Sequence, residues 1–135
     1  MMQSDFFTIA IAGIACVFLM TPARALDLNS FRAQHHLPAL SASATLSGAA
    51  YSHAHDLARR QHLDHNGFRE PMSFVRSAAA ENVAFGCETE DCVFQMWAKS
   101  AGHRANMLRR DVTSYGLASA TGANGRRYWV LELGN

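Results

Sequence analysis

Apolar side chains recur along the middle of the chain with the spacing of an amphipathic helix. Between residues 41 and 61, small and apolar residues fall three or four positions apart, which places them on one helical face. The residues on this predicted buried face are Leu46, Ala49, Ala50, His53, Ala54, Leu57 and Ala58. Residues on the opposite side are polar, and we expect them to be solvated: Ser52, His55, Arg59 and His62. The pattern therefore predicts one long helix, followed by a turn that stops at Gly67.

Shorter helices are predicted where a polar cap residue precedes apolar positions. Asn29 or Ser30 caps the first of them, which ends before Pro38. Thr89 is a second cap, and the acidic residues directly after it suit the first turn of a helix. Gly102 interrupts the helix that begins there. The predicted shorter helices cover residues 29–34, 71–79, 90–101 and 103–110.

The C-terminal end of the chain changes to the pattern of a β-hairpin. Residues 115–121 and 127–133 are predicted strands, and Asn124-Gly125 between them is a strong turn signal. Residues 81–86 are too few to assign by period. Apolar residues occupy both faces of the last strand, with Trp129, Leu131 and Leu133 on one and Tyr128 and Val130 on the other. A hairpin that is apolar on both faces needs cover on both, which predicts an α+β domain with helices flanking a small antiparallel sheet.

The first 25 residues are predicted to be an export leader. Residues 6–20 form an almost unbroken apolar run, which is too short for a membrane span of about 20 residues. An A-x-A ending of the kind that signal peptidase cuts follows at residues 23–25. We expect residues 1–25 to be removed and residues 26–135 to form a single secreted or periplasmic domain with no membrane span. The Gly-Ile-Ala-Cys stretch at residues 13–16 offers lipoprotein cleavage as the alternative.

Charge and composition restrict the partners of this domain. The chain carries 12 basic and 11 acidic residues, for a formal net charge of +1. A near-neutral chain lacks the basic surface expected of a nucleic-acid-binding protein, and no polybasic segment suggests anionic lipid. Disorder is also excluded, because 49% of the residues are hydrophobic. We therefore expect a small exported domain, monomeric, with no nucleic-acid partner.

Cys87 and Cys92 are the two cysteines that remain once a leader containing Cys16 is removed. An even pair in an exported chain predicts a disulfide. Free thiols or a reactive thiol are the alternatives. Glu88 and Glu90 disfavour a reactive thiol, because negative neighbours oppose formation of the thiolate.

All seven histidines lie in residues 26–135, but their spacing defines no metal site. His53 and His55 are two positions apart on one helix, so their rings point about 200° apart and cannot share an ion. His53 falls on the apolar face, and we expect it to be a hydrogen-bonded core residue. His62 and His65 are close enough to meet, yet no H-E-x-x-H pattern supports a zinc helix.

Residue spacing alone defines no functional site, but a family resemblance suggests one. Several segments match one protein family in the right order along the chain. They are residues 54–58 (AHDLA) with 63–65 (LDH), 80–84 (AENVA), 97–108 (WAKSAGHRANML) and 128–131 (YWVL). These segments resemble the sequence signature of the CAP superfamily, which comprises cysteine-rich secretory, antigen 5 and pathogenesis-related proteins. The third segment is similar to the form W-x-x-S-x-G-H-R-x-N-hydrophobic-L found in bacteria. The chain is therefore identified as a member of the short bacterial branch.

The resemblance implies an α-β-α sandwich whose cleft holds two histidines and two acids. Carried over to this chain, the histidines are His65 and His103, and the first acid is Glu81. Ser100 stands at the position of the second acid, which leaves a mechanism with paired carboxylates short of one partner. His65, Glu81 and His103 are thus the candidate catalytic residues. The same three residues are the candidate ligands of Zn²⁺ or another divalent metal ion, and no other cofactor is predicted.

Two imidazoles and a carboxylate are compatible with more than one role. They could hold a divalent ion and leave positions open for water, which would suit hydrolysis. Without a metal, Glu81 could act as a general base with a histidine as the acid. The same three residues could instead form a polar network that ties a loop to the ends of two helices, with Arg104 and Asn106 securing the turn.

We expect the protein to work by binding rather than by turnover. The candidate ligands are a lipid or sterol, a metal ion, or a protein partner. The alternative is a divalent-metal-assisted, peptidase-like hydrolase acting on peptide or cell-envelope material, and a third possibility is an interaction module with an inert cleft. A lipid groove would use apolar residues that otherwise pack a helix, namely Phe68, Met72, Phe74 and Val75.

Overall fold

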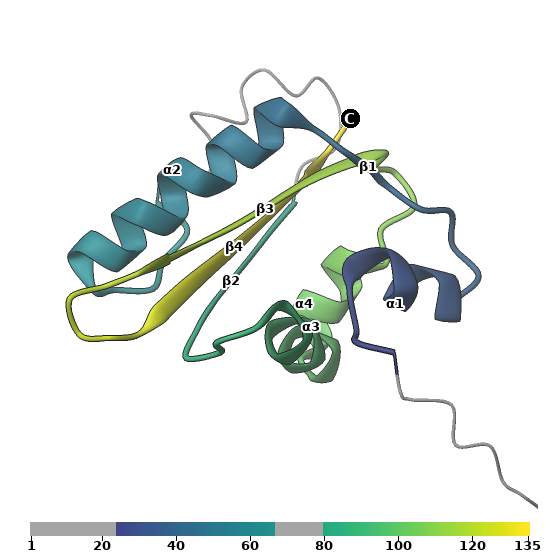
Figure 1. Ribbon diagram of the computed structural model, residues 1–135. Coiled ribbons are helices and arrows are strands. Elements are labelled where there is room, and N and C mark those ends of the chain that lie inside the picture. Colours follow the sequence, from purple (N-terminus) through teal and green to yellow (C-terminus); the bar gives the residue numbers. More distant parts are fainter. Residues whose placement is uncertain (1–23, 67–79) are drawn as a thin grey trace, which may run out of the picture.

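The chain folds into three layers, with a β-sheet between two layers of helix (Figure 1). The structure is a computed structural model, and it describes residues 24–66 and 80–135. Helix α2 covers one face of the sheet, while α1, α3 and α4 cover the other. This arrangement confirms the predicted α+β sandwich. The elements in chain order are α1 (Leu28–Gln34), β1 (Ser41–Ala42), α2 (Ala44–Arg60), β2 (Ala80–Phe85), α3 (Glu90–Lys99), α4 (Ala101–Met107), β3 (Ser114–Thr121) and β4 (Arg127–Gly134).

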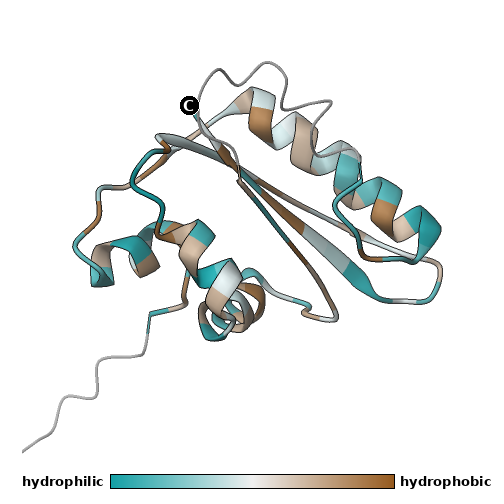
Figure 2. Cartoon of the chain, turned by 180° about the vertical axis from the view of Figure 1, so that it is seen from behind, coloured by the Kyte–Doolittle hydropathy of each residue, from teal (hydrophilic) through white to brown (hydrophobic). Residues whose placement is uncertain are grey.

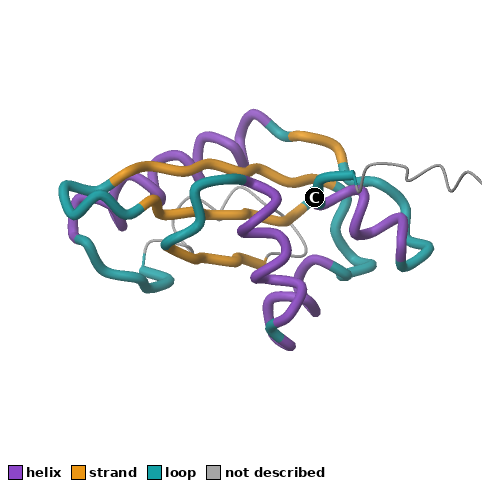
Figure 3. The backbone as a smooth tube through the Cα atoms, turned by 60° about the horizontal axis from the view of Figure 1, so that its bottom comes forward, coloured by secondary structure: helices purple, strands orange, loops and turns teal. Residues whose placement is uncertain are grey.

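The sheet has four strands in the order β1-β3-β4-β2 (Figure 3). Strands β3 and β4 form the predicted hairpin, and β2 pairs antiparallel with the other side of β4. Strand β1 has only two residues and runs parallel to β3, so the sheet is mixed rather than purely antiparallel. The physical reason is that Ser41 and Ala42 pair with β3 instead of joining the long helix. That helix begins only after Ser43, whose side chain caps it by accepting from the N–H of Leu46.

Helix α2 presents the buried face that its spacing predicts. Its buried residues are Leu46, Ala49, Ala50, His53, Ala54, Leu57 and Ala58. In Figure 2 hydrophobic and hydrophilic bands alternate along the same helix. The helix ends at Arg60, close to the predicted end at Gln61, because Gln61 adopts a left-handed conformation with φ 53° and closes the last turn on Leu57. The predicted stop at Gly67, the helix over 71–79 and the candidate lipid groove lie outside the described residues.

Strand β4 supplies both hydrophobic cores, because its alternate side chains point to opposite faces of the sheet. Trp129, Leu131 and Leu133 join the core beneath α1, α3 and α4. Tyr128 and Val130 join the core beneath α2. The next residue on this second face is Glu132, which is fully buried. An acid therefore occupies a position where the alternation of the strand calls for an apolar side chain.

The helices on the other face are fastened at their ends by polar contacts. Asp27, rather than Asn29 or Ser30, caps α1, and Asp27 and Ser30 form a capping box. The N–H of Leu26 donates to Asp91 Oδ1 at 2.5 Å, which ties the residue before Asp27 to the first turn of α3. Helices α3 and α4 are separated at Ser100, two residues before the predicted break at Gly102.

The predicted disulfide between Cys87 and Cys92 is present in the segment that leads from β2 into α3. Thr89 caps α3 as its sequence predicts, by accepting from the N–H of Cys92. The indole N–H of Trp129 donates to the carbonyl of Cys87 at 2.7 Å, which fixes the loop to β4. None of the helices in the described ranges is long and apolar enough to cross a membrane.

Candidate functional site

Glu81 lies on edge strand β2, between one histidine inside the protein and one at its surface. Its Oε2 is 2.7 Å from Nδ1 of His53, which comes from the buried face of α2. Its Oε1 is 2.6 Å from Nδ1 of His65, which follows α2 and is exposed. The Glu81 side chain is itself almost fully buried, so it links the interior to the surface through its two oxygens.

The three residues predicted from the family resemblance line one open cleft of about 430 Å³. Ser100 lines the same cleft, at the position that the second acid would occupy. The residues around it are His65, Glu81, Ser100, Gly102, His103 and Asn106. The structure thus brings the predicted residues to one place, while their catalytic or metal-binding role stays a prediction.

Two asparagines hold the two sides of the cleft together. Asn106 of α4 donates through Nδ2 to the carbonyl of Glu81 at 3.2 Å and to Oδ1 of Asn82 at 2.9 Å. Asn82, which is fully buried, donates in turn to the carbonyl of His103. Arg104 only reaches the carbonyl of Ala98, at 3.3 Å. The expectation that Arg104 and Asn106 secure the turn agrees with these contacts, and Asn82 links the backbone of His103 to β2.

A second set of contacts supports the turn that carries His65. Arg60 donates to Asp64 through Nη1 at 2.7 Å and to Asp56 through Nε at 2.7 Å. The hydrogen bond from Arg60 holds the pKa of Asp64 well below its ordinary value, so Asp64 stays ionised. Asp64 Oδ1 lies 3.9 Å from Nε2 of His53, which places a negative charge behind this histidine.

The pKa shifts in the cleft separate charged from neutral groups. Burial is the largest influence on Glu81 and opposes its ionisation, but the hydrogen bonds from His53, Glu132 and His65 and the charge of His53 together lower its pKa below the ordinary value. The hydrogen bond to Glu81 raises the pKa of His53 against the effect of burial. The pKa of His103 is lowered, first by burial and then by the charge of His65, so its imidazole is neutral at neutral pH.

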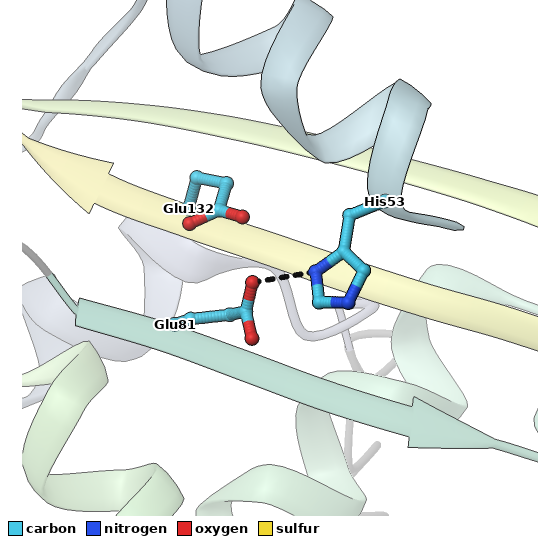
Figure 4. Close-up of side chains that lie close together, drawn as sticks. All are labelled: His53, Glu81 and Glu132. Atoms are coloured by element: carbon cyan, nitrogen blue, oxygen red, sulfur yellow. Dashed lines mark hydrogen bonds and ion pairs between the residues drawn. The ribbon is translucent and has the colours of Figure 1, made fainter. Parts of the chain in front are cut away.

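Glu132 is the functional candidate that sequence reasoning missed. It lies on β4 directly opposite Glu81, and Figure 4 shows the two carboxylates and His53 gathered between α2 and the sheet. Burial, and next the adjacent Glu81 carboxylate, raise the pKa of Glu132 to about 10. One signal in the sequence could have found it, because a lone acid in the apolar strand Tyr-Trp-Val-Leu-Glu-Leu falls on the stripe of Tyr128 and Val130.

The donor atoms converge inside the protein rather than in the cleft. Among residues 24–66 and 80–135, ligating atoms from three side chains come within 4.8 Å of one another only in the group His53, Glu81 and Glu132. The set implied by the family resemblance is less close: His65 contacts Glu81, and His103 lines the same cleft without completing such a group. A metal ion in the cleft would therefore require these side chains to draw together.

A layered α-β-α domain whose edge-strand glutamate faces two histidines at an open cleft is the arrangement that the family resemblance implies. The chain matches the model of the CAP family, described as the cysteine-rich secretory protein family, over residues 27–133, and it belongs to this family. It is 30% identical over 97 residues to the uncharacterized protein YkwD of Bacillus subtilis. That match covers 66% of this chain but only 38% of YkwD, so the chain corresponds to part of that longer relative.

Three solved bacterial structures share the fold. An outer surface protein of Borrelia burgdorferi superposes with a TM-score of 0.72 at 19% identity, covering 80% of this chain and 86% of that chain. An extracellular SCP-domain protein of Bacillus anthracis gives 0.68 at 21% identity, covering 80% and 37%. A cysteine-rich secretory protein of Staphylococcus aureus gives 0.65 at 16% identity, covering 78% and 35%. At these identities the likeness establishes the fold alone.

Proposed function

We propose that the protein is an exported CAP-domain binding protein that holds a polar ligand in the cleft between His65 and His103. One observation carries this proposal: both carboxylate oxygens of Glu81 are engaged by imidazole nitrogens. A carboxylate whose two oxygens already accept from histidines, and whose pKa is lowered by them, is a weaker base toward a substrate proton. The arrangement therefore favours binding over turnover.

The groups left free in the cleft determine the kind of ligand. Because an ionised carboxylate only accepts hydrogen bonds, Nδ1 of His65 donates to Glu81, and Nε2 is the ring nitrogen that remains for a ligand. His103 adds a neutral imidazole, and Ser100 adds a hydroxyl. These groups suit a polar ligand better than a sterol ring or an acyl chain.

A divalent metal ion is the simplest ligand of this kind. His65 and His103 would hold it through nitrogen, with Glu81 either as a third ligand or as the carboxylate that orients His65. When bound, such an ion would add positive charge and open coordination positions for a second ligand. The three residues already line the same cleft, and an ion would draw their side chains together.

Calorimetric titration of Zn²⁺ into the purified protein tests this site. We expect stoichiometric binding that is lost in His65→Ala and in His103→Ala. The matched control is His55→Ala, which removes an exposed histidine of α2 on the opposite side from His53. Binding that is equal in all four proteins would refute a metal in the cleft and would direct the search to polar organic ligands and protein partners.

Metal-assisted hydrolysis is the second candidate, and the presence of Ser100 beside the two histidines favours it. Peptide and cell-envelope substrates would then be turned over by the Zn²⁺-loaded protein. His65→Ala should abolish that activity while the circular dichroism spectrum stays unchanged. The absence of turnover in the loaded wild-type protein would leave binding as the function.

Export is the other part of the proposal. It is supported by the apolar run over residues 6–20 and the A-x-A ending at residues 23–25. Two of the proteins that share the fold are described as extracellular or outer-surface proteins. The intact mass and N-terminal sequence of protein recovered outside the cytoplasm should show Leu26 as the first residue. A retained leader, or an acylated Cys16, would contradict cleavage after Ala25.

A further inference from the structure

We propose that His53, Glu81 and Glu132 form a buried site for a divalent cation, which we call the inner site. It lies behind the cleft and differs from the metal site that the family resemblance implies. It uses neither His65 nor His103, and it gains a second carboxylate from β4. The proposal goes beyond ligand binding in the cleft and does not depend on it.

The three ligands come from three elements that the fold holds in fixed positions. Glu81 and Glu132 are register partners on β2 and β4, so their side chains leave adjacent strands side by side. His53 reaches them from the buried face of α2 (Figure 4). One ligating atom from each residue lies within 4.8 Å of the other two, before any ion draws them together.

The burial of these residues requires more compensation than residues 24–66 and 80–135 provide. Glu132 is 0% exposed, and His53 and Glu81 are each 6% exposed. Both oxygens of Glu132 lack a hydrogen-bonding partner among the described residues. A buried carboxylate without partners is costly, and a second carboxylate beside it adds repulsion. A divalent cation would neutralise both carboxylates and satisfy the oxygens of Glu132 at once.

The orientation of His53 also suits coordination of a metal ion. Its Nδ1 faces Glu81, while Nε2 has no hydrogen-bonding partner in the described part of the chain and lies 3.9 Å from Asp64 Oδ1. Metal-bound histidines commonly direct the second ring N–H at a carboxylate, which fixes the ring. Asp64, held ionised by Arg60, lies where such an outer carboxylate is required.

The donor set indicates which ion fits. Two carboxylates and one imidazole form a harder set than the two imidazoles of the cleft, so the inner site accepts an oxygen-preferring ion such as Mn²⁺ more readily than the cleft does. A proton on Glu132 is the competing way to remove its charge. A proton on Glu132 would let one of its oxygens donate to Glu81, and the other oxygen would still have no hydrogen-bonding partner among the described residues.

Calorimetric titration of Mn²⁺ into the full protein, stripped of metal with a chelator, tests the inner site. We expect one ion per chain in the wild type and about a 100-fold or greater loss of affinity in Glu132→Gln, which keeps the side-chain shape but removes a charged ligand. Glu88→Gln is the matched control, because it makes the same change at an exposed acid. His103→Ala should bind Mn²⁺ as the wild type does.

Crystals grown with Mn²⁺ locate the ion directly, which is a readout independent of affinity. We expect the Mn²⁺ peak in the anomalous difference map to lie between Glu81 and Glu132. Absence of Mn²⁺ binding to the wild type, or full binding by Glu132→Gln, would overturn the inner site. If binding is lost in His103→Ala but kept in Glu132→Gln, the ion sits in the cleft, the inner site is refuted and the proposed function stands. Should Glu132→Gln fail to fold in chelator, His53→Gln serves as the second variant.

Discussion

At the scale of single residues, the cleft depends on side chains whose polar groups are already used in hydrogen bonds within the protein. Asn82 and Asn106 connect β2 to α4, and Glu81 connects His53 and His65 to the sheet. A buried donor or acceptor that loses its partner costs about 1–3 kcal/mol, which is more than the hydrogen bond itself contributes. Positions of this kind should therefore dominate the response of the site to mutation.

Asn106→Ala is the most direct test of that view. It leaves the side-chain oxygen of Asn82 and the carbonyl of Glu81 without their donor. We expect about 1–3 kcal/mol of destabilisation in urea unfolding, together with weaker ligand binding in the cleft. Arg104→Ala removes one surface contact in the same helix and should change stability by less than about 0.5 kcal/mol. Equal effects of the two substitutions would contradict the proposed role of Asn106.

The sequence allowed some site residues to be predicted and concealed others. His53 was predicted to be a hydrogen-bonded core residue because it lies on the apolar face of its helix, and the structure confirms this. Its partner Glu81 could not be deduced from spacing, because the two residues are 28 positions apart and belong to different elements. Glu132 was missed because an acid in a strand is ordinarily solvated, and its burial depends on which face α2 covers.

At the scale of elements, periodicity predicts α2 well because the helix is long and has one buried face. Strand β2, with six residues, is too short for a period to be recognised. Strand β1 was assigned to the helix, since two residues cannot show any pattern and their pairing with β3 depends on the tertiary fold. The starts of α1 and α2 were predicted less accurately than the helices themselves, because the caps Asp27 and Ser43 act through local geometry.

The contact between α2 and β3 depends on one glycine. A Cβ atom at Gly116 would lie 2.2 Å from the backbone of Leu46 and Ser47, in the first turn of α2. Gly116→Ala must push the helix away from the sheet, and we expect about 1–3 kcal/mol of destabilisation by thermal or urea unfolding. Gly48→Ala adds the same methyl group to α2 where nothing lies within 4 Å. That control should be stabilising by up to about 1 kcal/mol, so the two variants should differ in sign.

The contacts at the C-terminal end of α2 make the stability of the protein depend on pH. The pKa of Asp64 is lowered in the folded state, so its contact with Arg60 stabilises the protein above the ordinary value of 3.8 and is lost as the pH falls below it. Arg60→Gln should therefore lower the melting temperature at pH 7, and the difference from wild type should shrink below pH 4.

The matched control for this prediction is Arg59→Gln. Arg59 contacts only the partly exposed Asp56, and its own side chain is 73% exposed. We expect almost no change in melting temperature at either pH. A difference between wild type and Arg60→Gln that stays constant from pH 7 to pH 3 would show that Asp64 is not the group responsible.

At the scale of the whole molecule, the two apolar faces of β4 account for the sandwich. A strand that buries side chains on both sides requires two helical layers, and this much is predictable from residues 127–133 alone. The same alternation could not show which layer would carry polar groups. That depends on His53 from α2 meeting the edge of the sheet, which is a consequence of how α2 packs across β3 and β4.

The contact between Leu26 and Asp91 gains significance if the leader is removed after Ala25. The nitrogen that donates to Asp91 would then change from a neutral amide to the ammonium group at the start of the mature chain. A hydrogen bond would become an ion pair at the first turn of α3, where Asp91 also accepts from Gln95.

Asp91→Asn should lower the stability of the processed protein by up to about 1 kcal/mol at pH 6 and have a smaller effect on a precursor that cannot be cleaved. The ammonium group gains a partner on folding, so its pKa is raised. The stabilisation by this ion pair is complete below the ordinary pKa of the ammonium group, about 8, and is lost as the pH rises through its raised pKa in the folded protein. Melting temperatures of wild type and Asp91→Asn at pH 6 and pH 10 would reveal this ion pair. Equal effects of Asp91→Asn on the processed protein and on the precursor would contradict it. Proteolytic maturation would then also act as a stabilising modification, because the folded domain holds a carboxylate ready for the charge that cleavage creates.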